Sequence, residues 1–163
     1  MGLIVCGFPG VGKSTLAKNE TKYYPLVEFR DSDSSLFPRA GFPENYLHYI
    51  ELAVRERGIT FISTHKAVLN GLHERQISHV VVAPEPTLKM EYIARYAARG
   101  STAQFVQLML EKWDEFHADM AVHAHECRLS SLVYLSSGQT LEDVILGVSL
   151  IGADLVGRKE QGK

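Results

Sequence analysis

The chain has 163 residues, of which 45% are hydrophobic and 22% charged, with a formal net charge of -2 at pH 7 and a pI near 6.4. This composition is ordinary for a globular domain and excludes a disordered, collagen-like or coiled-coil chain. The length predicts one domain, 1–163, which must then bind both partners of any reaction that it catalyses. The weak negative charge gives no overall attraction to a polyanion, so nucleic acid is a possible partner but not the favoured one.

The apolar segments predict a protein that stays out of the membrane. No apolar run approaches the roughly 20 residues that a spanning helix needs. The apolar start, 1–6, is too short for a signal-peptide core and leads directly into a glycine-rich loop. Cys6 lies in that run, and Cys6 and Cys127 are the two cysteines, which suits buried thiols in a reducing compartment. We therefore expect a soluble, cytoplasmic protein without a membrane partner.

Short apolar runs bounded by turn-forming residues predict five β-strands. They lie at 3–6, 26–29, 59–63, 79–83 and 132–135. Helical patterns separate them, one beginning at Lys13 and a second covering 43–57 and stopping at Gly58. This alternation predicts an α/β fold, a doubly wound five-stranded parallel sheet with helices on both faces. Ligands of such a sheet bind at the carboxyl ends of its strands.

A long helical stretch, 87–127, lies between the fourth and fifth strands. It is interrupted where Gly100 ends one helix and Ser101 or Thr102 caps the next. Its apolar stripe is predicted to be core and not a base-stacking platform, and comprises Phe105, Leu108, Met109, Trp113 and Phe116. Three histidines are predicted to be surface residues without a metal, namely His117, His123 and His125.

The chain ends with one more predicted helix. A turn at Gly138 leads into it, Thr140 is its expected N-cap, and Asp143 occupies the capping-box position. The final residues, 157–163, are polar and are expected to fray.

The segment 7–14 matches the phosphate-loop pattern G-x-x-x-x-G-K-[ST] completely, and it lies between an apolar strand and a helix. The glycines let successive backbone N–H groups face phosphates. Lys13 is expected to reach the β- and γ-phosphates, and the Ser14 hydroxyl to ligate Mg²⁺. ATP and Mg²⁺ are therefore the predicted cofactors. The predicted binding residues are Gly7, Gly10, Val11, Gly12, Lys13, Ser14 and Thr15, the last more as a helix residue than as a ligand.

Asp31 and Asp33 follow the second predicted strand, where an acceptor would bind. A carboxylate there holds Mg²⁺ through water or takes the proton of an attacking hydroxyl. We assign Asp31 the base or metal role and Asp33 contact with the acceptor, both as catalytic candidates. The alternative is an ordinary polar turn, because Asp and Ser are turn formers.

The third predicted strand ends without the acidic residue that many phosphate-loop proteins carry there. If the second-strand aspartates do not replace it, Mg²⁺ is held by Ser14, phosphates and water alone. The segment 63–66 points toward the same region, and Lys66 is placed to contact an acceptor phosphate. The alternative is a helix start with Thr64 as its cap.

Arg95 and Arg99 lie one turn apart on the same helix face. Two guanidinium groups there would close over the transferring phosphoryl group, with 87–127 as a helical lid that excludes water. Solvated arginines that pair with Glu91 are the alternative.

From Leu3 to about Ile145 the chain resembles the small nucleoside and nucleotide kinases of the P-loop superfamily, including short kinases common in bacteriophage genomes. The resemblance implies that the lid arginines contact donor phosphates or stabilise the transferring group, and that 136–139 lies beside the adenine. Arg30 and Asp31 also resemble the polynucleotide-kinase pattern, in which the aspartate takes the proton of a nucleic-acid hydroxyl. The spacing of Asp31 and Asp33 is similar to that of shikimate-type kinases.

These observations leave three functions open. The favoured one is a kinase that phosphorylates a nucleotide or nucleoside-type acceptor, with Arg30, Arg39 and Lys66 as candidates to bind its phosphate. A kinase acting on a hydroxyl of nucleic acid, at a strand end or a hydroxymethylated base, would use Asp31 or Asp33 as base. A nucleotide-binding ATPase or switch would need no acceptor.

Overall fold

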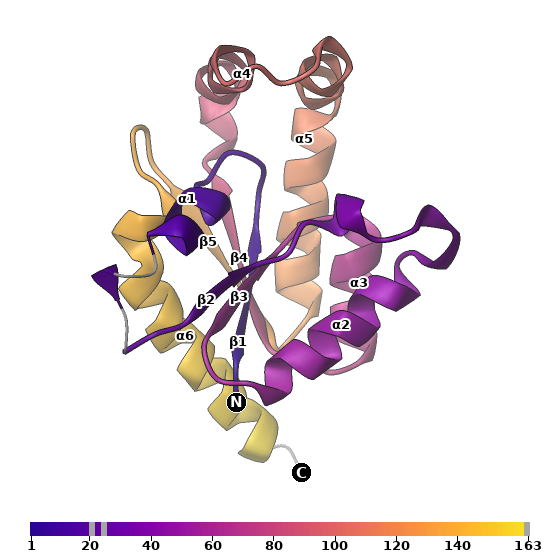
Figure 1. Ribbon diagram of the computed structural model, residues 1–163, viewed down its shortest axis with the longest axis vertical. Helices are drawn as coiled ribbons and strands as arrows, with labels where there is room; N and C mark the ends of the chain where they lie inside the picture. Colours follow the sequence, from indigo (N-terminus) through magenta and orange to yellow (C-terminus); the bar gives the residue numbers. More distant parts are fainter. Residues whose placement is uncertain (20–21, 24–25, 162–163) are drawn as a thin grey trace.

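The computed structural model describes residues 1–19, 22–23 and 26–161. It is an α/β structure with a five-stranded, all-parallel sheet in the order β2-β3-β1-β4-β5, as predicted (Figure 1). The strands are β1 (Leu3–Gly7), β2 (Phe29–Asp31), β3 (Ile59–Ile62), β4 (His79–Pro84) and β5 (Ser130–Leu135). None of the described helices combines the length and the apolar character needed to cross a membrane.

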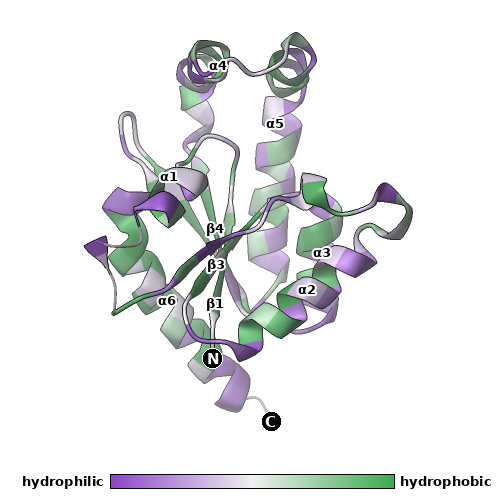
Figure 2. Cartoon of the chain, in the orientation of Figure 1, coloured by the Kyte–Doolittle hydropathy of each residue, from purple (hydrophilic) through white to green (hydrophobic). Residues whose placement is uncertain are grey.

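The apolar strand sequences follow from burial on both faces of the sheet. Every residue of β3 and β4 is buried, whereas the edge strands β2 and β5 contain partly exposed positions. Strands covered on both faces lose the apolar and polar alternation of a half-exposed sheet. Figure 2 shows the hydrophobic residues concentrated on the central strands and on the helix faces that turn toward them.

Six α-helices flank the sheet in the part of the chain that the structure describes. They are α1 (Lys13–Lys18), α2 (Glu44–Arg55), α3 (Lys66–Glu74), α4 (Lys89–Ala98), α5 (Ala103–Glu126) and α6 (Leu141–Gln161). Figure 1 shows α1 and α6 on one side of the sheet and α2, α3 and α5 on the other. The α4 helix and the start of α5 project beyond the carboxyl ends of the strands.

Several predicted helix boundaries are confirmed. Thr102 caps α5, and its hydroxyl accepts a hydrogen bond from Phe105 N at 3.2 Å. Gly100, which follows the α4 C-cap Arg99, has a φ of 81°. At the start of α6 the Asp143 carboxylate accepts from Thr140 N at 2.7 Å. Each of these two hydrogen bonds pairs a backbone N–H group that helix geometry leaves without a partner.

The second predicted strand was placed three residues too early. β2 begins at Phe29, which pairs with Ile59, the first residue of β3. Residues 26–28 therefore lie outside the pairing of β2 with β3, and Leu26 is 89% exposed. The apolar character of 26–29 alone could not show where the strand begins, because its first residue is determined by pairing with β3.

Two predicted helix ends were also wrong. The N-cap of α3 is His65 and not Thr64, because the His65 ring nitrogen accepts from Ala67 N at 3.3 Å. The tail does not fray at 157, since α6 continues to Gln161. An ion pair between Arg158 and Asp154 at 2.7 Å, one helical turn apart, supports this last segment.

The prediction that the α5 histidines lie on the surface holds for His125 but is wrong for the other two. His117 and His123 are only 4% and 9% exposed. His117 lies against Phe8 and Trp113, and His123 contacts the fully buried His79. Burial lowers the pKa of His79 to about 4. A helical histidine gives no sequence signal of its burial when the neighbouring pattern is only weakly amphipathic.

Candidate functional site

The loop between β1 and α1 requires glycine at several of its positions. Gly10 and Gly12 have φ values of 87° and 102°, a region that side chains disfavour. A Cβ at Gly7 would lie 2.7 Å from the Lys13 side chain, and one at Gly10 would lie 2.9 Å from the Tyr96 ring. The glycines of the sequence pattern therefore lie where the backbone has a positive φ or is too close to its neighbours to carry a side chain.

The backbone of this loop presents free hydrogen-bond donors. Within the part of the chain that the structure describes, the N–H groups of Lys13, Ser14 and Thr15 donate to no protein acceptor. Consecutive N–H groups that converge in this way form a concavity suited to phosphate oxygens.

The Lys13 side chain folds back on its own loop. Its Nζ donates to Gly7 O at 2.6 Å and lies 3.5 Å from Phe8 O. Burial lowers the pKa of Lys13 to about 8, and the negative charge of Asp31 partly offsets this effect. Lys13 is thus a desolvated cation held by carbonyl groups, and phosphate oxygens would replace them as stronger partners.

Ser14 and Asp31, the two residues predicted to hold the metal, are in direct contact. The Ser14 hydroxyl donates to Asp31 Oδ2 at 2.6 Å. These residues come from α1 and from the carboxyl end of β2, which pack together although β3 separates β2 from β1. A hydroxyl and a carboxylate oxygen side by side are ligands of the kind that Mg²⁺ prefers.

Asp33 has a different environment. Its Oδ1 accepts from Ser35 N at 2.8 Å and caps the short 3-10 turn Ser34–Leu36. The turn interpretation therefore accounts for one of its carboxylate oxygens, although Asp33 also lines the same cavity as Asp31.

The predicted lid arginines both lie at this site. Arg95 Nη1 donates to Gly10 O at 2.9 Å, and its guanidinium lies 4.3 Å from the centre of the Tyr92 ring. Arg99 donates from Nε to Ser101 Oγ at 2.9 Å and lies over the Tyr96 ring. With the loop and both aspartates, Arg95 and Arg99 line a cavity of about 610 Å³.

Two tyrosines of α4, not recognised from the sequence, join this helix to the phosphate loop. The Tyr96 hydroxyl donates to Pro9 O at 2.6 Å, and the Tyr92 and Tyr96 rings pack against Gly10. Their i, i+4 spacing was a detectable signal, but only the packing shows what they contact.

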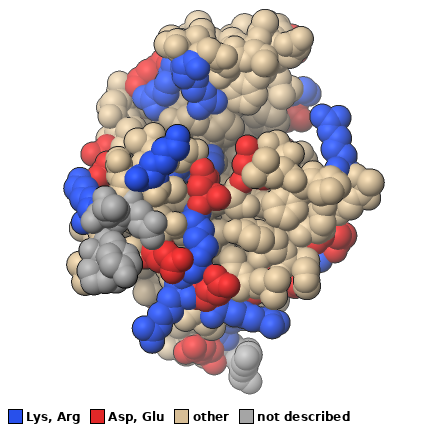
Figure 3. Space-filling model, in the orientation of Figure 1, with Lys and Arg blue, Asp and Glu red and all other residues tan. Residues whose placement is uncertain are grey.

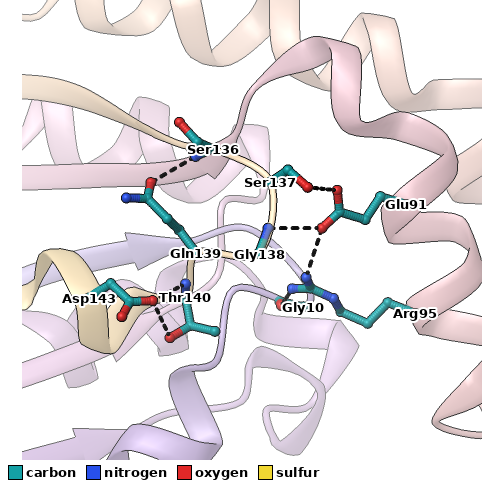
Figure 4. A network of polar contacts seen from close by, with 9 residues as sticks. All are labelled: Gly10, Glu91, Arg95, Ser136, Ser137, Gly138, Gln139, Thr140 and Asp143. Carbon is teal, nitrogen blue, oxygen red and sulfur yellow. Dashed lines mark hydrogen bonds and ion pairs between the residues drawn. The ribbon is translucent and has the colours of Figure 1, made fainter.

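A second unrecognised residue, Glu91, joins α4 to the loop after β5 (Figure 4). Its carboxylate accepts from Ser137 Oγ at 2.8 Å and Gly138 N at 3.2 Å, and Arg95 lies 3.4 Å away. The hydrogen bond from Ser137, followed by that from Gly138, lowers the pKa of Glu91. The predicted pairing of Arg95 with Glu91 is therefore present, as part of a network that also reaches the phosphate loop through Gly10.

A second cavity of about 440 Å³ adjoins the first, and Lys13, Ser63 and Phe105 line both. One wall is apolar and comprises Phe105, Leu108, Met109, Phe116 and Met120. The prediction that the α5 stripe is core is thus correct for the buried Trp113 and Met109, but Leu108 is 46% exposed. The stripe faces a cavity over part of its length.

Polar groups also line this cavity. Lys66 lines it and forms an ion pair with Asp119 at 2.9 Å. Ser63 Oγ is buried and has no hydrogen-bond partner among the described residues. A buried hydroxyl without a partner is rare in native proteins and marks a position where a ligand group or water completes the bonding.

The structure does not bring Arg30 or Arg39 to either cavity, which corrects their predicted role. Arg30 Nη2 donates to Arg57 O at 2.6 Å and pairs with Glu28 and Glu56, which lie toward the amino end of the sheet. Arg39 is exposed in the 3-10 turn Arg39–Gly41. Both residues are close to the site in sequence only, because the direction of a strand or turn side chain depends on local register.

Neither a protein-family model nor a curated protein matches this chain.

Proposed function

We propose that the protein is an ATP-dependent kinase of the P-loop class, in which α4 and α5 form the lid. One observation carries the proposal: most of the loop that matches the phosphate-loop pattern lines a cavity in which Ser14 contacts Asp31 at 2.6 Å and which two arginines also line. A glycine-rich turn without a ligand would have no reason to gather these charged groups in one place.

The residues suggest how phosphoryl transfer would proceed. The loop N–H groups and Lys13 would hold the phosphates of ATP, with Ser14 and Asp31 as the oxygen groups that hold Mg²⁺. Bound Mg²⁺ would neutralise charge between the phosphates. Arg95 and Arg99 would stabilise charge on the transferring group, and the tyrosine contacts would couple lid position to the loop. Catalysis would be mainly positioning and charge neutralisation.

The second cavity supports a nucleoside-type acceptor that is phosphorylated on a hydroxyl. Its apolar wall suits a planar ring, and Ser63 offers an unpaired hydroxyl. A monophosphate acceptor needs cations for its phosphate, and of the three predicted candidates only Lys66 lines this cavity, already paired with Asp119. Asp31 lines the donor cavity and is not among the residues that line the second one. In its base role, the alternative to holding Mg²⁺, it would take the proton of an acceptor hydroxyl that reaches into the donor cavity.

A hydroxyl carried by nucleic acid is the second candidate. Such an acceptor also needs no arginines to bind an acceptor phosphate, and Asp31 would take its proton in the same way. Figure 3 weighs against a large polyanion on the face drawn, where Lys and Arg side chains alternate with Asp and Glu instead of forming one basic surface.

Transfer of labelled γ-phosphate from ATP to a panel of acceptors tests the proposal. The panel contains deoxynucleosides, their monophosphates, and single- and double-stranded DNA with ordinary and hydroxymethylated bases. Label on a nucleoside supports the proposal, whereas label on DNA selects the second candidate. Label on a monophosphate alone would return the acceptor role to a cation clamp. Steady hydrolysis that no acceptor changes would identify an ATPase.

The lowered pKa of Lys13 predicts that ATP affinity depends on pH. In the free protein Lys13 loses its proton above about pH 8, whereas bound phosphates would stabilise the charged form. Binding above this pH must then take up a proton, so the Kd of MgATP should be about 10-fold higher at about pH 9 than at about pH 7. Calorimetric titration at constant ionic strength measures this change. Lys13→Arg, which stays charged, should bind with little pH dependence, and equal slopes for both proteins would contradict the prediction.

A further inference from the structure

A cluster of metal-binding side chains lies at the other end of the sheet from the phosphate loop. It comprises His79, the first residue of β4, with His123 and Cys127 at the end of α5. All three are buried, and their nearest donor atoms lie within 4.8 Å of one another. His123 and Cys127 are four residues apart, which places both on one helix face toward β4.

Hydrogen bonding determines which His79 nitrogen is available. His79 Nδ1 lies 2.8 Å from Ile77 O, and a carbonyl oxygen only accepts, so Nδ1 carries the proton. His79 Nε2 therefore has a free lone pair directed at His123 Nε2, 2.8 Å away, which must donate to it. A histidine whose second nitrogen donates to a backbone carbonyl has the arrangement found in protein metal sites.

The donor set and its spacing suit zinc. Tetrahedral Zn²⁺ with bonds of about 2.0 Å to nitrogen and about 2.3 Å to sulfur requires ligand atoms about 3.3–3.6 Å apart. The two histidine nitrogens are 2.8 Å apart and no pair of donor atoms is separated by more than 4.8 Å, so rotamer changes of His123 and Cys127 would bring the three atoms to this spacing. Two imidazoles and a thiolate form a borderline-soft set, which disfavours Mg²⁺ and Ca²⁺.

An entry path and further donors are also present. A cavity of about 350 Å³ reaches the cluster and is lined by His123 and Cys127 together with His73 and Glu126. The His73 ring centre lies 6.5 Å from that of His123. His73, Glu126 or a water could supply a fourth ligand.

We propose that His79, His123 and Cys127 form a binding site for a zinc-type divalent ion that links β4 to the end of α5. Binding would remove the thiol proton of Cys127 to solvent and move the His123 proton from Nε2 to Nδ1, so that three lone pairs face the ion. Because the ligands come from separate elements, the bound ion would stabilise the folded chain. The site is independent of the proposed kinase function and uses none of its residues.

Cobalt and zinc binding test this proposal on the purified full chain after treatment with a chelator. Co²⁺ should bind with one ion per chain and give a thiolate-to-cobalt charge-transfer band, which the oxygen ligands Ser14 and Asp31 cannot produce. Zn²⁺ should displace it and raise the thermal unfolding temperature.

Variants then identify the ligands. Cys127→Ser should abolish the band, and His123→Gln should weaken zinc binding by at least about 100-fold, since even the partners of metal ligands contribute about 10- to 100-fold. The exposed His125 lies on the same helix turn, so His125→Gln is the matched control and should bind as the unaltered chain does. Absence of the band in the unaltered chain overturns the proposal whatever the variants do. A band that persists in Cys127→Ser also overturns it, because the thiolate would then be Cys6.

Discussion

Replacement of Lys13 by alanine is expected to reduce phosphoryl transfer by about 1,000-fold, near the upper end of the loss measured when one preorganised donor to developing charge is removed. Among the described residues the Lys13 ammonium hydrogen-bonds only to carbonyl groups of its own loop, at 2.6 Å from Gly7 O and 3.5 Å from Phe8 O. Its removal should therefore leave the fold intact while depriving the phosphates of their nearest cation. Steady-state kinetics with the acceptor that the panel identifies, together with circular dichroism, measures both consequences.

Lys18→Ala is the matched control, because Lys18 is an exposed lysine at the end of the same helix, α1. It should retain normal turnover. If Lys13→Ala also retains turnover while folding normally, the phosphate loop is not the catalytic centre and the proposed function is wrong.

Asp31→Asn is expected to lower kcat by about 100-fold or more, the range of a lost general base, with little change in ATP affinity. The substitution keeps the size of the side chain and an oxygen for the Ser14 hydroxyl, which now donates to Asp31 at 2.6 Å. Only the negative charge and the basic character are lost. Measuring kcat as a function of Mg²⁺ concentration separates the two assigned roles: a metal ligand raises the Mg²⁺ required for half-maximal rate, whereas a base lowers kcat at saturating Mg²⁺.

Asp33→Asn provides the comparison, since Asp33 lines the same cavity but uses one carboxylate oxygen to cap the turn Ser34–Leu36. An asparagine can still accept the hydrogen bond from Ser35 N, so the fold should persist. We expect a smaller effect than at Asp31. An unchanged rate for Asp31→Asn would reduce the pair of aspartates to an ordinary polar turn.

Neither of the two proposed sites depends on contact with the other. The phosphate loop follows the carboxyl end of β1, while His79 begins β4. The Lys13→Ala protein should accordingly keep its cobalt charge-transfer band. Measuring phosphoryl transfer by the Cys127→Ser protein tests the converse, namely whether loss of the metal site changes the rate at the distant phosphate loop.

The local sequence determined much of the architecture. The runs at 3–6, 59–63 and 79–83 were recognised as buried strands because strands covered on both faces are apolar at nearly every position. Thr102 and Gly100 marked the break between α4 and α5, since capping depends on a few neighbouring backbone groups. The need for glycine at Gly10 and Gly12 could be predicted for the same reason, because it depends on the backbone geometry of a single turn.

Only the tertiary structure decided which side chains meet. Arg30 and Asp31 are adjacent in the sequence, yet Asp31 reaches Ser14 while Arg30 pairs with Glu28 and Glu56. Successive strand residues point to opposite faces, and the pairing of Phe29 with Ile59 fixes which residue faces which way. His79 and His123 lie 44 positions apart and meet only because α5 packs across the sheet. Contacts of this kind depend on register and packing between distant elements, which no local pattern contains.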